Sequence, residues 1–419
     1  MKIEIPFGSS YLELDTSGFE LKGVLCPKSA GSAENEEACI REALEKPIGS
    51  PCLCRLAEGK KHVLIIASDH TRPVPSRLIL PPVFDEIRSA SPDAVIKLLI
   101  ATGFHRASTE EELRCKLGDI YGKVDIEIHD ARKTEEMVFK GCLPSGGELW
   151  LNRLVDWADL VVAEGFIEPH FFAGFSGGRK SILPGIASQK TVFANHNSAF
   201  IANPCARAGI LSGNPIHADM LWAAAAAKLA FIVNVVLDGN KQVAAAFSGS
   251  PTEAHEVGCD YVAKLSSAAR TEADIVVAGN GGYPLDQNIY QSVKGMTAAE
   301  ACVRPGGVIV MCASCCDGHG GEDFFKFFAE SKAPTEVRRR ILAIPQDETL
   351  PDQWEAQILA RIMEHAQLIM VTEKSAADYV REMGMHSAAS LSEAMELACS
   401  LTAGRALTVI PDGVGIIIR

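Results

Sequence analysis

Five short polar segments of the chain contain side chains that could bind ligands or transfer protons. The first is Ser68-Asp69-His70-Thr71-Arg72-Pro73, which directly follows the apolar run His-Val-Leu-Ile-Ile-Ala. Its arginine could form a bidentate contact with a carboxylate, and Asp69 could orient Arg72 or a ligand hydroxyl. A capped turn that carries a surface ion pair is the structural alternative, so this segment by itself leaves both interpretations open.

Two further segments each carry a histidine. In Ala101-Thr-Gly-Phe-His105-Arg106 the histidine follows an apolar run, and the unperturbed pKa of an imidazole lies near neutrality, which suits acid–base catalysis. In Asn195-His196-Asn197 the imidazole could bind a metal ion. The alternatives are a structural histidine in the first segment and a helix cap in the second.

The densest segment, residues 164–185, contains Glu168-Pro-His170, several glycines and the pair Arg179-Lys180. Glycines beside basic residues suggest a backbone cradle for an anion, most simply a phosphate. The segment differs from a P-loop, because Arg179 stands where a glycine is required before the lysine. Lys180 could instead act as a covalent nucleophile, with the neighbouring glycines letting a planar ligand approach the backbone.

The fifth segment, residues 279–295, begins with Gly-Asn-Gly-Gly and ends with Tyr290-Gln291-Ser-Val-Lys294-Gly. Its glycines do not match the GxGxxG pattern of dinucleotide-binding sites. On a helix, Tyr290 and Lys294 would lie one turn apart on the same face, with Gln291 beside them. That face could present one amide and one cation to an acidic substrate lodged between two domains.

These segments follow short apolar runs that alternate with helical patterns. The runs are largely continuous rather than alternating in polarity, as expected for parallel strands covered on both faces. The predicted strands are His62–Ala67, Val95–Ala101, Val124–His129, Leu160–Ala163, Ile275–Ala278, Val308–Met311, Leu368–Val371 and Leu407–Ile410. The predicted helices include Pro81–Ala90, Ser108–Lys116, His217–Ala230, Pro251–Ser266, Asp352–His365 and Ser392–Leu401. This order indicates doubly wound α/β sheets, in which ligands bind beyond the carboxyl ends of the strands.

The chain length indicates more than one domain. At 419 residues and 44.9 kDa, a typical size of about 100–200 residues per domain suggests two domains, or at most three. Glycine and serine punctuation between residues 236 and 273 precedes a new β/α series that opens at Ala273. We therefore predict an N-terminal α/β domain over residues 1–268 and a C-terminal α/β domain over residues 269–419, with the active site in the cleft between them.

Composition and charge exclude several classes of protein. Hydrophobic residues make up 47% of the chain and charged residues 22%, which rules out a disordered or fibrous protein. The net charge of −13 argues against bulk affinity for nucleic acid or for an anionic membrane. The first residues lack an apolar signal region and no stretch approaches 18 uncharged apolar residues, so a cytoplasmic location is expected.

The 13 cysteines are expected to be reduced thiols, because the sequence shows no export signal. One cluster, Cys312-x-x-Cys315-Cys316 followed by His319, could form half of a zinc site. It has no second CxxC as a partner, and it follows the apolar run Gly-Gly-Val-Ile-Val-Met. We therefore predict buried free cysteines at the end of a strand rather than a zinc or redox centre.

Taken together and in order, the motifs SDxTRP, GxHR, EPHxFAGxSGGRKSxxPG, NH and YQSxKG resemble those of the nickel-dependent lactate racemase family. The resemblance runs from the N-terminal Ile-Pro-Phe-Gly to about Lys294, with a compatible α/β tail behind it. It implies a racemase or epimerase of a 2-hydroxy acid, with lactate as the default substrate. It also implies nickel and a tethered cofactor, pyridinium-3-thioamide-5-thiocarboxylic acid mononucleotide.

The resemblance implies roles for four residues in the chemical step. Lys180 would form the thioamide link to the cofactor. His196 would supply the protein's ligand to nickel, in a planar site completed by soft sulfur donors that suits Ni(II). His105 and His170 would be the paired acid/base groups, one serving each enantiomer.

Further residues are implied around the cofactor and the substrate. Asp69 and Arg72 would border the cofactor, and the substrate would contact Arg72, Tyr290, Gln291 and Lys294. We add the inference that a loop could accommodate the nucleotide phosphate, formed by Ser176, Gly177 and Gly178. Bulk at Phe104 and Phe175 would alter the space for the substrate, so lactate is the default rather than a conclusion.

Hydride transfer is the mechanism that the resemblance implies, and it suits the substrate. The α-C–H next to a carboxylate is a very weak acid, so it is hard to remove as a proton. Its removal as hydride requires an electron-poor ring and a base that takes the hydroxyl proton as the ketone forms. With one histidine on each side, either enantiomer could be oxidised, and the flat 2-keto acid could rotate and be reduced on its other face.

Two alternatives from other classes remain at this point. An NAD-linked 2-hydroxyacid dehydrogenase would also use α/β domains and a His/Arg pair, although the missing GxGxxG pattern counts against it. A non-catalytic metal-binding protein would cluster its ligands, whereas the 11 histidines are scattered. The expected partners are a small 2-hydroxy acid and the cofactor-maturation enzymes, with no nucleic acid or membrane and with an oligomer left open.

Overall fold

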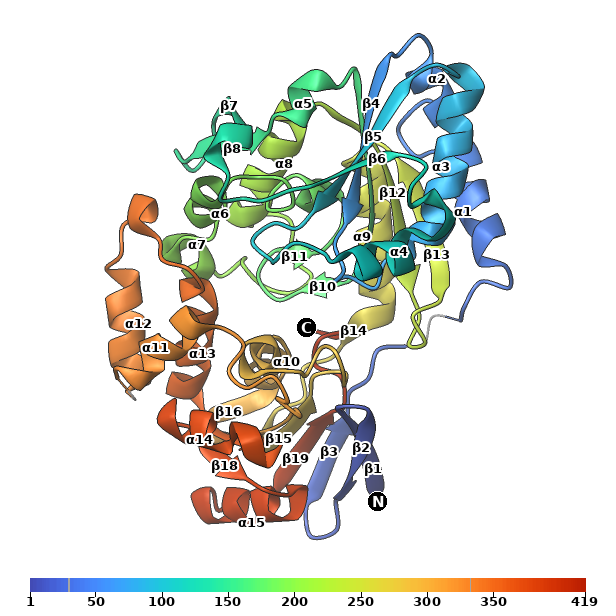
Figure 1. The fold of residues 1–419 in the computed structure, drawn as a ribbon. Helices are drawn as coiled ribbons and strands as arrows, with labels where there is room; N and C mark the ends of the chain where they lie inside the picture. The colour runs from blue at the N-terminus through green and yellow to red at the C-terminus, as the bar shows by residue number, and fades with distance from the viewer. Residues whose placement is uncertain (29–30, 332) are drawn as a thin grey trace.

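Two α/β units, each built on a six-stranded sheet, form the computed structural model, which describes residues 1–28, 31–331 and 333–419 (Figure 1). The first sheet has the order β13 (Val243–Gly249), β12 (Leu229–Leu237), β9 (Leu160–Phe166), β4 (His62–Ser68), β5 (Val95–Ala101) and β6 (Asp125–Ile128). Its strands are parallel except for β13, which runs antiparallel to β12. A short hairpin joins these two strands, and a hairpin connection permits only antiparallel pairing.

The second sheet is parallel throughout. Its order is β18 (His386–Ala388), β17 (Gln367–Val371), β16 (Val303–Cys312), β15 (Ala273–Gly279), β19 (Ala406–Ile410) and β3 (Glu20–Val24). The predicted α/β class with doubly wound sheets is therefore confirmed. Each predicted strand overlaps a strand of the structure in sequence. Long apolar β-branched runs suit central strands that are buried on both faces.

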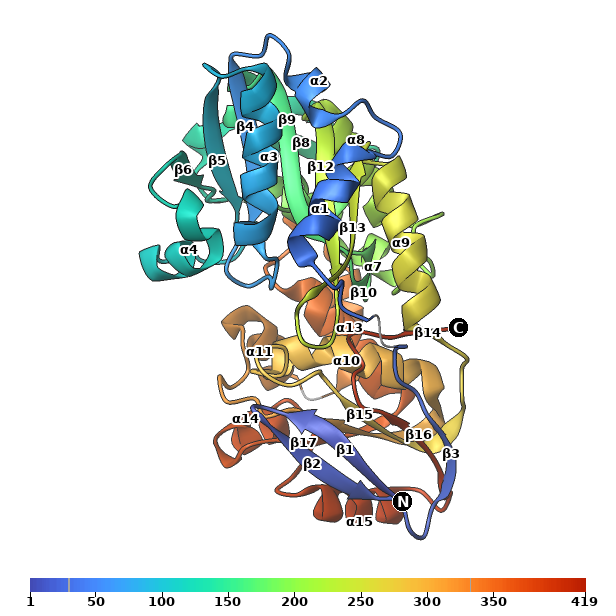
Figure 2. The same ribbon diagram turned by 90° about the vertical axis from the view of Figure 1, so that its right-hand side faces the viewer.

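The N-terminal strands pack with the second sheet, although they come first in the chain (Figure 2). The hairpin of β1 (Lys2–Phe7) and β2 (Ser10–Asp15) buries Ile3, Ile5 and Leu14 among side chains of β15, β16 and β19. The division into residues 1–268 and 269–419 stays a prediction. The structure shows that residues 1–24 do not pack with the sheet expected to contain them, since their apolar side chains are buried on the other sheet.

Helices cover both faces of each sheet. On one face of the first sheet lie α1 (Glu36–Glu45), α2 (Leu53–Ala57) and α3 (Ser76–Ala90), and on the other lies α8 (Pro215–Ala226). In the second unit, α10 (Ile289–Cys302) and α13 (Gln353–His365) cover the face that continues the core of the first unit, and α15 (Leu391–Leu401) covers the opposite face. One core cluster thus spans both units.

The remaining elements are short or peripheral. The further helices are α4 (Glu110–Leu117), α5 (Leu154–Trp157), α6 (Gln189–Asn195), α7 (Ser198–Ala202), α9 (Glu253–Ser266), α11 (Glu322–Ala329), α12 (Pro334–Leu342) and α14 (Ala377–Glu382). The further strands are β7 (Met137–Cys142), β8 (Glu148–Asn152), β10 (Pro169–His170), β11 (Gly174–Phe175), β14 (Ser267–Ala268) and β20 (Ile417–Ile418).

One expectation from the sequence is corrected by this fold. The helix predicted to run to Ala230 ends at Ala226, because Lys228 adopts a φ of 54° in the turn that starts β12. The segment 236–273, within which the domain boundary was expected, contains β13, which completes the first sheet, and α9, which packs against β13. The polar residues at the start of this segment form the hairpin turn between β12 and β13.

The cysteine cluster behaves as a strand end. Cys312 is the last residue of β16, and both Cys312 and Cys315 are fully buried, as predicted. Burial raises the pKa of each of these thiols to about 12. Over residues 1–28, 31–331 and 333–419, no helix has the length and apolar character needed to cross a membrane.

Candidate active site

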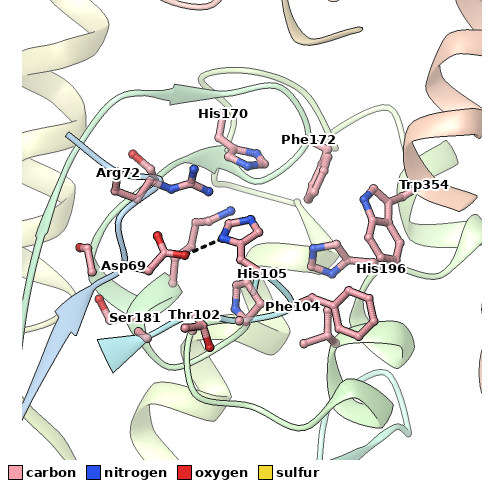
Figure 3. Close-up of a pocket in the computed structure, with 18 of the residues that line it drawn as sticks. Asp69, Arg72, Thr102, Phe104, His105, His170, Phe172, Ser181, His196 and Trp354 are labelled. Carbon is pink, nitrogen blue, oxygen red and sulfur yellow. Dashed lines mark hydrogen bonds and ion pairs between the residues drawn. The ribbon is translucent and has the colours of Figure 1, made fainter. Parts of the chain in front are cut away.

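A cavity of about 450 Å³ lies where the carboxyl ends of β4, β5 and β9 face the second unit (Figure 3). Most of the residues singled out from the sequence line it. From the first unit these are Asp69, Arg72, His105, His170, Ser176, Gly177, Lys180 and His196. From the second unit they are Tyr290, Gln291 and Lys294. The expected site between two α/β units is therefore present as a cavity shared by both.

Asp69 and His105 form a hydrogen-bonded pair at the ends of neighbouring strands. His105 Nδ1 lies 2.7 Å from Asp69 Oδ2, and Thr71 Oγ1 donates to the other oxygen of Asp69 at 2.7 Å. Burial alone would raise the pKa of Asp69, but the hydrogen bond and charge of His105 and the charge of Arg72 lower it strongly. An ionised Asp69 makes His105 Nδ1 the protonated ring nitrogen, which leaves Nε2 free to accept a proton.

Hydrogen bonds to three other parts of the first unit hold the two loops that carry this pair. The loop after β4 is fixed by Glu164, whose Oε1 accepts from the backbone N–H of Ser68 at 2.6 Å. Lys116 Nζ donates to the carbonyl of Arg72 at 3.1 Å. The loop after β5 turns at Gly103, with φ 55°, and Gly103 N–H donates to the carbonyl of Gly185 at 2.9 Å.

His170 differs from His105 in its surroundings. It lies in β10, and its ring packs against Phe171 and Phe172 at centroid distances of 5.0 and 4.6 Å. The backbone N–H of Ala173 donates to His170 Nδ1 at 3.3 Å, so the neutral ring carries its hydrogen on Nε2. Burial, followed by the charges of Lys180, Lys294 and Arg72, holds the pKa of His170 well below its usual range.

Lys180 follows the glycine-rich loop, and its ammonium lies 5.7 Å from the centre of the Phe172 ring. It lines this cavity and also a second one of about 600 Å³. Burial and the charges of Arg179 and Arg72 hold the pKa of Lys180 well below its usual range. A lowered pKa favours the uncharged amine, which is the form that acts as a nucleophile.

The glycine-rich loop is packed more tightly than an open anion cradle. Gly178 N–H donates to Asn234 Oδ1 at 2.8 Å, and Ser176 Oγ bonds to Glu168 N at 2.9 Å. A Cβ atom on Gly177 would lie 2.8 Å from the carbonyl oxygen of Phe166. Ser176 and Gly177 line the cavity, whereas the Gly178 N–H is already bonded within the protein, and the expected phosphate contact of this loop stays a prediction.

Arg179 fixes the shape of this loop from inside the core. It is fully buried, and its guanidinium donates to the carbonyl oxygens of Ala173 at 2.7 Å and Phe175 at 2.8 Å. It also donates to His217 Nδ1 at 3.0 Å. The Arg179-Lys180 pair thus divides into a buried anchor and a cavity-lining amine, which the sequence does not distinguish.

His196 lies at the end of α6 and is buried between two aromatic rings. Phe172 and Trp354 each meet it edge-on at centroid distances of 5.1 Å. Among the described residues, Nδ1 of this histidine has no hydrogen-bond partner. Burial and the charge of Lys180 lower the pKa of His196 to about 3, so the ring is neutral. The neighbouring Asn197 caps α7 by accepting from Phe200 N–H at 3.0 Å, so metal-ligand and cap interpretations apply to adjacent residues.

Helix α10 presents the expected face to the cavity from the second unit. Asn288 caps the helix, and its Oδ1 accepts from the backbone N–H of Gln291 at 2.9 Å. Lys294 Nζ donates to Gln291 Oε1 at 2.6 Å. Tyr290 Oη accepts from Trp354 Nε1 at 3.0 Å. Burial and the charge of Arg72 lower the pKa of Lys294 to about 8.

Sequence reasoning missed several lining residues. Trp354 and Glu355 on α13, with the preceding Asp352, complete the wall formed by the second unit. Their only sequence signal was a position at the start of a predicted helix. Phe104 lines the cavity beneath the Arg132 guanidinium, 4.2 Å from its ring centre, as expected for a residue that limits space. Phe175 instead packs in a separate core cluster with Ile167 and Val236.

Residues capable of binding a metal do not cluster. Over the described parts of the chain, no three His, Cys, Asp or Glu side chains lie close enough together to bind a metal ion. His196 would therefore need ligands from a non-protein group to complete a metal site.

Comparisons with known proteins cover the whole chain. A family model described as "Lactate racemase N-terminal domain" matches residues 7–209, and one described as "Lactate racemase C-terminal domain" matches residues 268–418. The lactate racemase of Thermoanaerobacterium thermosaccharolyticum is 53% identical over 100% of this chain and 99% of its own length. The lactate racemase of Lactiplantibacillus plantarum is 48% identical with the same coverage.

Solved structures agree with these matches. The lactate racemase apoprotein of T. thermosaccharolyticum superimposes with a TM-score of 0.97 at 53% identity, over 100% of both chains. A protein of Thermotoga maritima superimposes with a TM-score of 0.66 at 19% identity, over 92% of this chain and 100% of its own. The second likeness shows the fold alone.

Proposed function

This chain belongs to the lactate racemase family, and on that premise we propose that it interconverts the enantiomers of a 2-hydroxy acid, with lactate as the first substrate to test. Such an enzyme is an isomerase. One observation supports the proposal above the others: a single cavity brings together two histidines with different hydrogen-bond partners, a lysine of lowered pKa and a cation-bearing helix face. This membership also favours a racemase over an NAD-linked dehydrogenase or a non-catalytic metal-binding protein.

The residues of the cavity fit a nickel-containing nucleotide tethered to the protein. His196 is neutral, buried and without a partner at Nδ1 among the described residues, which suits a metal ligand. Lys180 is an amine of lowered pKa where two cavities meet, which suits a covalent link. We propose that Lys180 carries pyridinium-3-thioamide-5-thiocarboxylic acid mononucleotide, made by maturation enzymes, and that His196 binds its nickel. When bound, this group would accept hydride from the α-carbon and return it.

The two histidines would handle the hydroxyl proton. His105 Nε2 would take the proton of one enantiomer, because Asp69 holds Nδ1–H and stabilises the imidazolium that forms. His170 would serve the other enantiomer. Because its neutral ring carries the hydrogen on Nε2, Nδ1 would first have to release the Ala173 N–H and take up the ring hydrogen, so that Nε2 could accept the hydroxyl proton. The cations around His170 make its imidazolium a strong acid that gives up its proton readily to the keto oxygen.

The substrate carboxylate would bind to the two cations that line the cavity beside α10. Lys294 lies beside Gln291, and the Arg72 guanidinium lines the same cavity from the first unit. A carboxylate between an ammonium and a guanidinium gains charge-assisted hydrogen bonds, and this would hold the α-carbon in place. Tyr290, which accepts a hydrogen bond from Trp354, would form the wall of the site next to the substrate.

The fate of the α-hydrogen tests the proposal. Hydride that passes to a bound ring and returns never resides on an exchangeable group, so 2-deuterated lactate racemised in ordinary water should give inverted product that keeps its deuterium. Chiral separation at low conversion followed by mass spectrometry measures this. A two-base reaction at His105 and His170 would give inverted product carrying solvent hydrogen, because imidazolium protons exchange rapidly. Extensive loss of label would therefore exclude hydride transfer.

His196→Ala should keep the covalent adduct but lose most of its nickel. The organic part would stay anchored at Lys180, while one of the metal's donors would be removed. Loss of a group that only supports a metal ligand typically weakens metal binding by about 10-fold to 100-fold, so loss of the ligand itself should weaken it at least as much. Nickel content divided by adduct content, from metal analysis and intact mass, gives the readout. His365→Ala, at a histidine bonded to the Val303 carbonyl in the second unit, serves as the matched control. Unchanged nickel per adduct would remove His196 from the metal's coordination.

A further inference from the structure

The second cavity, which meets the candidate active site at Lys180, is strongly basic. Six basic side chains line it, and Glu168 is the only acidic side chain among the described residues that do so. The basic residues are Arg72, Lys180, Arg207, Lys241, Lys294 and Arg419. The chain as a whole carries a net charge of −13, so this concentration of cations is a local feature and does not follow from composition.

These cations lack counterions within the protein. Among the described residues, none of the six side chains takes part in an ion pair, whereas the nearby Arg361 pairs with Glu300 at 2.6 Å. Burial raises the pKa of the Glu168 carboxyl, which disfavours its charged form. Cations that share a cavity repel one another, so an anion from outside the protein would stabilise this arrangement.

Arg207 and Lys241 distinguish the second cavity from the first, because neither lines the candidate active site. Lys241 is exposed in the turn between β12 and β13, and Arg207 is half-buried beyond α7. Burial lowers the pKa of Arg207 to about 10, which leaves its guanidinium charged at neutral pH. The cavity therefore presents cations from exposed Lys241 to Lys180, where the two cavities meet.

Charge and volume together indicate a ligand that carries a phosphate. Arg72 and Lys294 already supply two cations for the single charge of a substrate carboxylate. A phosphate monoester carries about −1.5 to −2 charges at neutral pH, and guanidinium and ammonium groups are its usual partners. The volume of about 600 Å³ lies in the range of about 300–1,000 Å³ that is typical of small-molecule sites.

We propose that the second cavity is the entrance for a nucleotide, and that Arg207 and Lys241 bind its phosphate before the nucleotide reaches Lys180. No covalent bond forms or breaks in this step. The cations attract the phosphate from a distance and so raise the rate of association, an effect that salt screens. The inference rests on the proposed function in one respect, which is that Lys180 carries a nucleotide.

Binding of a pyridinium nucleotide to the protein without adduct tests the site. Nicotinic acid mononucleotide is titrated by calorimetry into protein made without the maturation enzymes. It should bind, and its affinity should fall as salt rises from about 20 mM to about 200 mM, because the charges are screened. Nicotinic acid riboside, which lacks the phosphate, should bind at least about 10-fold more weakly, since charge-assisted hydrogen bonds are lost.

A double variant locates the phosphate. Arg207→Gln combined with Lys241→Gln should weaken binding of the mononucleotide by at least about 10-fold and flatten its salt dependence. Lys123→Gln combined with Arg153→Gln is the matched control, since it changes the net charge equally. Both control side chains are exposed in the first unit, and among the described residues they pair with no carboxylate and line neither cavity. The control should bind like the unsubstituted protein.

Competition for limiting cofactor tests the role as an entrance. Equal amounts of the unsubstituted protein and the Arg207/Lys241 variant are exposed together to the maturation enzymes, and intact mass gives the adduct on each. The unsubstituted protein should acquire most of the adduct at low salt, and this advantage should shrink as salt rises. The control variant should share the adduct equally. Thermal unfolding shows whether each variant is folded.

The outcomes separate this inference from the proposed function. Equal binding of the mononucleotide by the Arg207/Lys241 variant, or equal binding of the riboside, would overturn the phosphate site. Weakened binding with an equal share of adduct would overturn the entrance. Either result would leave the attachment at Lys180 intact. Absence of adduct from unsubstituted protein exposed to the maturation enzymes would instead overturn the proposed function, and the entrance with it.

Discussion

Lys180→Ala protein, produced together with the cofactor-making enzymes, should have the unmodified mass of the chain and no racemase activity above background. The reason is geometric and electrostatic. Lys180 lines both cavities, and burial with neighbouring cations lowers its pKa, which favours the uncharged, nucleophilic amine. Alanine has no group that could form a thioamide. Intact mass of natively produced protein gives the first readout and racemisation of lactate the second.

The matched control for this experiment is Lys190→Ala. Lys190 lies ten positions further on, and its exposed side chain pairs with Glu148 at 2.9 Å. That variant should carry the full cofactor mass. Adduct on the Lys180→Ala protein would show that the tether belongs to another lysine. Thermal unfolding shows whether the variant is folded, so that a missing adduct is not caused by misfolding. A host without the maturation enzymes is unsuitable, because every variant would then be unmodified.

Asp69→Asn should lower kcat by roughly 100-fold to 10,000-fold. The affinity for oxamate, the amide analogue of a 2-keto acid, should stay close to that of the unsubstituted protein. Asp69 accepts from His105 Nδ1 at 2.7 Å and is held in place by Thr71. An anion at this position accepts the hydrogen of His105 Nδ1, which leaves Nε2 free, and it also stabilises the imidazolium that forms when Nε2 takes a proton. An asparagine can present its NH₂ group to Nδ1 instead, which would leave the hydrogen on Nε2, where no proton can be accepted.

Two measurements check the interpretation of Asp69→Asn. The split between kcat and binding matters, because a general loss of structure would reduce both. Asp156→Asn, whose partner Lys140 lies 2.6 Å away on the surface of the first unit, is the control and should leave kcat unchanged. If Asp69→Asn retains kcat within about threefold, Asp69 does not act through His105 and the proposed proton transfer is wrong.

Four of the six strands in each sheet were predicted, because their signal is local. Runs such as His62–Ala67 and Val95–Ala101 are continuous and apolar, and they became β4 and β5. The N-terminal strands β1 to β3 were not predictable in the same way. The next strands along the chain belong to the first sheet. The hairpin of β1 and β2 instead packs on β15, and β3 pairs with β19, in each case more than 250 residues away. No local pattern encodes pairing at that separation.

The site shows the same division between local and long-range information. His105, His170, Lys180 and His196 could be selected from the sequence because their types and motifs are unusual for core positions. Trp354 and Glu355 could not, since a tryptophan and a glutamate at the start of a helix are ordinary there. The phosphate contact expected from Ser176, Gly177 and Gly178 stays a prediction, and one of its donors already takes part in a long-range contact. Asn234 takes the Gly178 N–H from a strand 56 residues further along the chain.

The sequence by itself determined the α/β class, most strands of both sheets and the candidate residues, because hydrophobic periodicity and side-chain chemistry are properties of short segments. Only the tertiary structure decided how each of those residues is used. It made Arg179 a buried anchor and left its neighbour Lys180 as a cavity-lining amine, and it gave His105 and His170 opposite hydrogen-bond partners at Nδ1. Burial, hydrogen bonds and nearby charges set protonation and nucleophilicity, and all three depend on residues that meet only when the chain folds.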